Sequence, residues 1–111
     1  MAWNIIFAKS NRGDELVKDL IKKLQKSTIA KIAHHIDLLV EQGPILPMPY
    51  FKKITSSIYE LRIRGKQEVR IFYTFNKNQI YLLHLFQKKS QKTPSKEIMI
   101  AEERFKSLTS I

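Results

Sequence analysis

Residues 57–86, SIYELRIRGKQEVRIFYTFNKNQIYLLHLF, contain three runs in which β-branched and aromatic residues recur with a period of two. That period is typical of β-strands, whose successive side chains point to opposite faces of a sheet. The runs are separated by RGKQ (64–67) and NKNQ (76–79), and both are good turn sequences. This stretch therefore predicts a three-stranded antiparallel meander.

Two amphipathic helices are expected on the amino-terminal side of the meander. Apolar residues recur at helical spacing from residue 16 to residue 24, and Asp14 is the expected N-cap. A second apolar stripe runs from residue 29 to residue 40, with Thr28 as the expected N-cap and Gly43, followed by proline, as the stop signal. The short link between the two stripes predicts a helical hairpin.

Extended segments and a last helix complete the predicted set of elements. Residues 4–8 are expected to form a further strand at the edge or in the centre of the sheet. Residues 44–51, whose prolines break the helical periodicity, are expected to be extended or loop structure. Thr93 and Pro94 can supply the N-cap and first residue of a terminal helix, whose apolar face runs from residue 98 to residue 108.

The expected element order is β-α-α-β-β-β-α. It describes an α+β domain with the helical hairpin on one face of a small sheet, antiparallel except where the amino-terminal strand joins it. The chain has 111 residues, 43% of them hydrophobic, so a single domain over residues 1–111 is expected. Cysteine is absent, and no apolar segment approaches the roughly 20 residues of a membrane span. A soluble, cytoplasmic protein is therefore expected.

Positive charge is concentrated in the middle of the chain. The whole sequence has 20 Lys and Arg against 10 Asp and Glu, and residues 52–92 contain ten basic and two acidic side chains. Like charges repel one another unless an anion binds between them. Nucleic acid is therefore the favoured partner, with an acidic protein or a membrane surface as alternatives.

Two strand arginines are candidates for contacting a phosphate. If the first hairpin of the meander places Arg64 opposite Glu68, Arg62 lies directly opposite Arg70 on the same face. Two guanidinium groups so placed favour binding of an anion. Purely structural roles are the alternative, because Glu60 shares a face with Arg62 and Glu68 is close to Arg70 in sequence. We favour Arg70 as functional, because Arg64 would already engage Glu68.

The end of the last meander strand adds aromatic and cationic side chains to the same face. An even register across the second hairpin brings His84 or Phe86 beside Arg70. Lys88 and Lys89 follow just beyond the strand end. The resulting concavity suits single-stranded RNA, whose phosphates bind cations and whose bases stack on aromatic rings. A satisfied strand histidine and a core phenylalanine are the alternatives at positions 84 and 86.

No conventional catalytic set is recognisable in the sequence. His34 and His35 point about 100° apart on a helix and cannot chelate one ion together. The sequence has no cysteine and no glycine-rich phosphate loop, and we expect no metal or other cofactor. An enzyme of this kind would work with cations, using the 2′-hydroxyl of RNA as nucleophile. Neighbouring cations favour proton exchange by Lys88 or Lys89.

Three segments together resemble the phage-derived, HigB-type branch of the RelE/ParE toxin superfamily. They are YELRI (59–63), VRIFY (69–73) and LLHLFQKKSQKTPSKEIMIAEERF (82–105), within a similarity that spans residues 3–108. The resemblance implies a RelE-like fold and a toxin of a type II toxin–antitoxin system. RelE-like members of the superfamily cut messenger RNA in the ribosomal A site without a metal, whereas ParE-like members poison DNA gyrase.

The resemblance also implies roles for individual residues. Arg62 and Arg70 resemble the family's strand arginines, and Lys88 and Lys89 resemble the basic residues after its last strand, so these four are expected to be catalytic. Ser90 stands where this branch ordinarily has threonine. The residues expected to contact RNA are Lys52, Lys53, Tyr73, His84, Phe86 and Lys92. For the lysines at 52 and 53, mere solvation is the alternative.

The expected function is that of a ribosome-dependent mRNA endoribonuclease that inhibits translation. Its implied partners are the ribosome, mRNA and a cognate antitoxin of the HigA-like helix-turn-helix kind, with no membrane partner. A ParE-like gyrase inhibitor and a non-catalytic RNA-binding domain are the alternatives.

Overall fold

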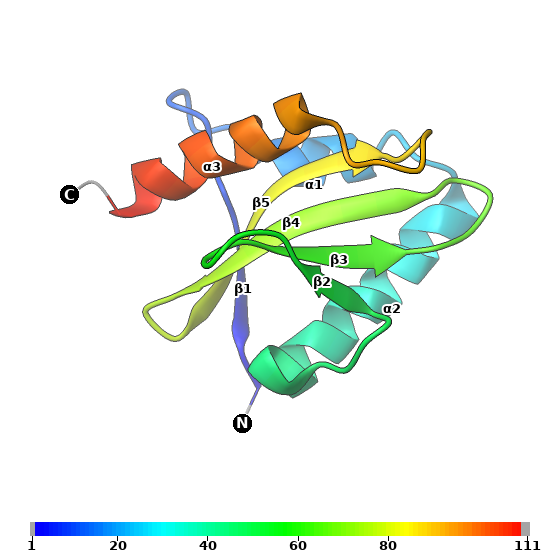
Figure 1. Cartoon of the computed structure of the whole chain (residues 1–111), viewed down its shortest axis with the longest axis horizontal. Coiled ribbons are helices and arrows are strands. Elements are labelled where there is room, and N and C mark those ends of the chain that lie inside the picture. Colours follow the sequence, from blue (N-terminus) through cyan, green and yellow to red (C-terminus); the bar gives the residue numbers. More distant parts are fainter. Residues whose placement is uncertain (1, 110–111) are drawn as a thin grey trace.

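The computed structural model describes residues 2–109, which form a five-stranded mixed sheet with the strand order β1-β5-β4-β3-β2 (Figure 1). The strands are β1 (Asn4–Phe7), β2 (Phe51–Lys53), β3 (Tyr59–Ile63), β4 (Val69–Asn76) and β5 (Gln79–Gln87). β1 pairs in parallel with β5 at one edge, and all the other pairings are antiparallel. The predicted meander is therefore confirmed as β3, β4 and β5, and the predicted amino-terminal strand lies at the edge of the sheet.

Helices cover both faces of this sheet. They are α1 (Leu16–Ile21), α2 (Lys26–Gln42) and α3 (Ser95–Thr109), with a short 3-10 turn, η1 (Gly43–Ile45), after α2. α1 and α2 contribute to one hydrophobic cluster and α3 to the other, so the sheet lies between them (Figure 1). Within the described part of the chain, no helix is long and apolar enough to cross a membrane.

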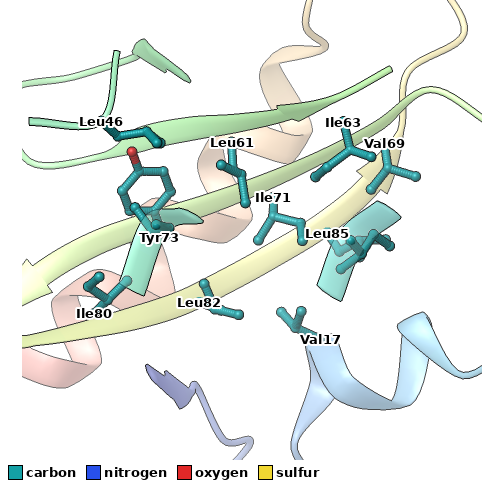
Figure 2. Packing of buried hydrophobic residues seen from close by; sticks show 12 residues of the cluster. Val17, Leu46, Leu61, Ile63, Val69, Ile71, Tyr73, Ile80, Leu82 and Leu85 are labelled. Atoms are coloured by element: carbon teal, nitrogen blue, oxygen red, sulfur yellow. The ribbon is translucent and has the colours of Figure 1, made fainter. Parts of the chain in front are cut away.

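Alternate side chains of the meander build the core between the sheet and the helices α1 and α2. Figure 2 shows Leu61 and Ile63 of β3, Ile71 of β4 and Leu82 of β5 in one apolar layer, with Val17 of α1 beside them. Each of these residues has essentially no exposed surface. Burial of one such side chain contributes about 1.5–3 kcal/mol to folding, so this layer fixes the register of the strands.

The opposite face of the sheet is apolar at its centre and is covered by α3. Ile58, Phe72, Leu83 and Phe86 form a second buried cluster with Ala101 of α3. A register shift between Phe72 and the next residue of β4 inserts Leu83 as an extra residue in β5. Because both faces are buried, β4 and β5 have nearly continuous apolar runs in place of strict alternation.

The expected N-caps of the first two helices, and the expected end of the first, are wrong. α1 ends at Ile21, short of residue 24, and begins after Glu15, while the backbone N–H of Asp14 donates to Ser10 Oγ at 3.1 Å. α2 begins at Lys26, so Thr28 is a buried residue inside the helix and not its cap. Residues 46–50 form the expected loop, and the edge strand β2, which the sequence did not predict, follows it because its backbone pairs with β3. The predicted end of α2 at Gly43 is confirmed, with a φ of 55° that suits glycine.

Candidate active site

A cationic pocket of about 410 Å³ lies at the end of the sheet where the β3–β4 turn and the exit from β5 meet. Its lining residues are Arg62, Arg64, Glu68, Arg70, Lys88, Lys89, Ser90 and Gln91. Five of these eight side chains are cations, and one is an acid. The pocket therefore contains all four residues that the sequence predicts as catalytic, and it has the electrostatic character of an anion site.

Strand register explains why these cations meet. Arg62 of β3 lies directly opposite Arg70 of β4, as predicted, and Arg70 in turn lies opposite Phe86 of β5. The backbone N–H of Lys88 donates to the carbonyl oxygen of Glu68 at 2.8 Å, which continues the β4–β5 pairing beyond the end of β5. Because side chains alternate along a strand, Lys88 and Glu68 project to the same face as Arg70.

The carboxylate of Glu60 contacts both arginines. It is 1% exposed, and its Oε1 lies 3.6 Å from the Nε of Arg62 and 3.6 Å from the Nε of Arg70. Within residues 2–109, both Nε atoms are buried without a hydrogen-bond partner. Two guanidinium groups share one carboxylate, so this cluster retains a net positive charge that faces the pocket.

Thr93 connects the loop before α3 to this cluster. Its Oγ1 donates to Oε2 of Glu60 at 3.3 Å, and α3 begins only at Ser95. The expected role of Thr93 as N-cap is therefore wrong, because its hydroxyl is used to hold the loop against β3. The loop held in this way is the one that carries Lys88 and Lys89.

Arg70 is far more enclosed than the sequence suggests. Its side chain is 2% exposed, and its Nη1 lies 3.0 Å from Oε2 of Glu68 and donates to the carbonyl oxygen of Val69 at 3.1 Å. Glu68 is not reserved for Arg64, whose Nη1 is 3.8 Å away. Arg70 is therefore a buried wall of the pocket, because Glu60 of β3 and Glu68 of the β3–β4 turn hold its guanidinium in place.

Several charged side chains surround the ammonium group of Lys88. Partial desolvation lowers the pKa of its ammonium group, and the charges of Arg70, Arg62 and Lys52 lower it further against an opposing effect of Glu60. Lowering the pKa increases the fraction of neutral amine near pH 7. Lys89, the next residue, is exposed at the rim.

The predicted aromatic wall is not open to solvent. His84 is 8% exposed and Phe86 is 7% exposed, and the two rings stack at 6.1 Å beneath α3. Nε2 of His84 lies 2.7 Å from Oε1 of Glu97, and its Nδ1 lies 3.3 Å from Nη1 of Arg104. Both residues hold α3 on the sheet, so neither ring forms an open stacking face beside Arg70, although Phe86 also lines a second pocket at the end of β5.

Burial lowers the pKa of His84 below its ordinary value. The hydrogen bond to Glu97 and its charge oppose this effect, and the nearby charge of Arg104 adds to it. A neutral ring fits the geometry when Nε2–H donates to Glu97 and Nδ1 accepts from Arg104. Both ring nitrogens of His84 are therefore hydrogen-bonded to side chains of α3, which connects β5 to that helix.

Tyr73 and Lys53 belong to the opposite side of the sheet. Tyr73 is 1% exposed in the core beneath the helices α1 and α2, and burial together with Tyr59 raises its pKa. Lys53 pairs with Tyr59 in register, whereas Lys52 pairs with Glu60 and shares the face of the cationic pocket. The RNA contact expected of Tyr73 is therefore wrong, and Lys53 is placed away from the pocket.

The remaining lining residues come from segments that the sequence does not single out as a site. Arg64 and Glu68 flank the β3–β4 turn, and Ser90 and Gln91 follow the two lysines in the loop before α3. The opposite charges of Arg64 and Glu68 on either side of the turn are the sequence feature that indicates these two residues. Lys92 is exposed in the same loop, where its carbonyl oxygen accepts a hydrogen bond from Ser90 Oγ at 2.9 Å. No three His, Cys, Asp or Glu side chains in the described chain are placed to hold a metal ion.

A search among curated proteins finds no match. Residues 19–106 match the family described as phage derived protein Gp49-like. The match includes every residue that lines the cationic pocket, together with most of α3. The chain therefore belongs to the phage-derived Gp49-like proteins, a family of the general RelE/HigB toxin type.

Proposed function

We propose that this protein is the toxin of a type II toxin–antitoxin system and that it inhibits translation by cutting mRNA on the ribosome. The observation that carries the proposal is the gathering of Arg62, Arg70, Lys88 and Lys89 around one pocket from three segments of the chain. Membership of a RelE-like toxin family supports it, because toxins of that type are endoribonucleases in general.

The proposed reaction uses the nucleophile that RNA itself contains. The 2′-oxygen forms a bond to the adjacent phosphorus as its proton passes to a water molecule, and the bond from phosphorus to the 5′-oxygen breaks as that oxygen gains a proton from Lys88. The products are a 2′,3′-cyclic phosphate and a 5′-hydroxyl. Charge on the phosphorane is greatest between these events, and Arg62 and Lys89 are placed at the pocket to stabilise it.

We assign proton transfer to Lys88 and a positioning role to Arg70. The lowered pKa of Lys88 suits a group that gives its proton to the leaving 5′-oxygen near neutral pH. Arg70 is too enclosed for broad contact with substrate, but its charge helps to lower that pKa, and its contacts with Glu60 and Glu68 fix the pocket wall.

The ribosome is the proposed source of substrate alignment. A few cations act on a phosphodiester mainly by positioning and charge stabilisation, so the RNA must be held with its 2′-oxygen in line with the scissile bond. A cognate antitoxin, of the HigA-like helix-turn-helix kind in this proposal, restrains the activity in the cytoplasm.

The test compares cleavage of an mRNA on programmed ribosomes by the wild type, Lys88→Gln, Lys88→Arg and a control, Lys77→Gln. Lys77 is exposed in the β4–β5 turn, at the other end of β4 from the pocket. We expect Lys88→Gln to cut about 10²- to 10³-fold more slowly. Lys88→Arg should bind RNA but cut slowly, because arginine keeps its proton. Wild-type cleavage by Lys88→Gln would refute the assignment.

A further inference from the structure

A second pocket, of about 420 Å³, lies beside the cationic pocket and is called here the α1 pocket. Its apolar lining consists of Leu20, Leu24, Leu85 and Phe86. Its polar lining consists of Lys23, Gln87 and Lys89. These residues come from α1 and the segment just after it, from the end of β5 and from the loop that follows β5, so the pocket is formed where α1 meets the sheet.

The two pockets are neighbours at one end of the molecule. Lys89 lines both of them. The segment between α1 and α2 is also connected to the β3–β4 turn, because the backbone N–H of Gln25 donates to Oε1 of Gln67 at 3.1 Å. That turn carries Arg64 and Glu68 of the cationic pocket. An extended ligand bound in one pocket can therefore continue past Lys89 into the other.

The lining of the α1 pocket favours a ligand that carries negative charge and also has an apolar surface. Lys23 and Lys89 provide two ammonium groups, and among the described residues no acid lines the pocket. Leucine side chains offer apolar surface to a sugar and a base, and the amide of Gln87 can both donate and accept hydrogen bonds. The volume lies within the usual range of small-ligand sites, about 300–1,000 Å³. A nucleoside followed by its phosphate has this combination of properties.

We propose that the α1 pocket binds a nucleoside of the same RNA strand whose neighbouring phosphate is cut in the cationic pocket. This inference rests on the proposed function, because it requires RNA to be the ligand. Lys23 contacts a flanking phosphate, and the amide of Gln87 hydrogen-bonds the edge of the base. The α1 pocket thereby contributes a base preference that the cationic pocket, which contacts only backbone, does not supply.

Binding of a short single-stranded RNA to the free protein tests the phosphate contact. The variants are Lys23→Gln and its matched control, Lys22→Gln, which changes an exposed lysine of the same segment that does not line the pocket. One phosphate contact contributes about 0.7 to the slope of log affinity against log salt for single strands. We expect Lys23→Gln to reduce that slope by about this amount and Lys22→Gln to leave it unchanged. Equal slopes for both variants would refute the contact.

Cleavage-site mapping on programmed ribosomes tests the base preference. Messages that differ only in the nucleotide next to the cut are compared for the wild type and Gln87→Ala. Loss of one neutral hydrogen bond should change discrimination between bases by about two- to tenfold. An unchanged order and ratio of the four bases in Gln87→Ala would refute the base contact. Failure of the wild type to cut any message would instead refute the proposed function, so the two failures are distinguishable.

Discussion

Arg70 combines the deepest burial with the closest ion pairs of the cations around the pocket. It is 1% exposed, and its guanidinium lies between Glu60 and Glu68. Removing one partner of a buried ion pair typically costs about 3–5 kcal/mol, and here the buried Glu60 would retain only its 3.6 Å contact with Arg62 Nε. We therefore expect Arg70→Ala to lower the free energy of unfolding by an amount of this order, as measured by urea denaturation.

Arg62→Ala is the matched control for that substitution. Arg62 shares Glu60 with Arg70, but its side chain is 20% exposed. We expect a smaller loss of stability from Arg62→Ala and a larger loss of cleavage per folded molecule, because this arginine reaches the pocket. A midpoint for Arg70→Ala equal to that of the wild type would contradict the structural role that its burial indicates.

At the scale of elements, α3 is attached to the sheet through His84, whose ring can titrate. The folded pKa of His84 lies below its ordinary value of 6.5, so the unfolded chain binds more protons than the folded one as the pH falls through that value. Stability therefore decreases on acidification below about 6.5. We expect the free energy of unfolding of the wild type to fall between pH 7.5 and pH 5.5 more steeply than that of His84→Gln.

The comparison of the wild type with His84→Gln can also contradict this expectation. Glutamine cannot titrate, but its amide can still donate to Glu97 and accept from Arg104. Parallel pH curves for the wild type and His84→Gln would show that protonation of His84 does not control the attachment of α3. Hydrogen exchange in the α3 backbone, measured at the same two pH values, would show whether the helix separates before the sheet unfolds.

Sequence alternation predicted the meander and the Arg62–Arg70 pairing because the faces of a strand follow from its period of two. By the same alternation, Tyr73 lies on the face of β4 opposite to Arg70, so the sequence itself argues against an RNA contact for Tyr73 beside that arginine. The covering of His84 by α3 could not be predicted, since it depends on how a helix distant in sequence packs on the sheet. The formation of β2 likewise depends on pairing with β3 and not on local propensity.

At the scale of the whole molecule, the net charge of +10 governs encounters with partners. We expect the association rate with the cognate antitoxin to fall as salt is added, because charge attraction is screened over about 8 Å at physiological ionic strength. Stopped-flow measurement from low to high salt checks this expectation. An association rate that is indifferent to salt would indicate recognition through apolar surfaces.

Primer extension of one mRNA, with and without programmed ribosomes, tests the central claim most directly. Addition of the purified protein should produce new 5′ ends within the codon that occupies the A site, and the same RNA without ribosomes should be cut far less. This difference is expected because, in the proposed mechanism, the cations of the pocket contribute charge and proton transfer and the ribosome aligns the RNA. An intact message on ribosomes that are occupied and exposed to excess protein would contradict the account.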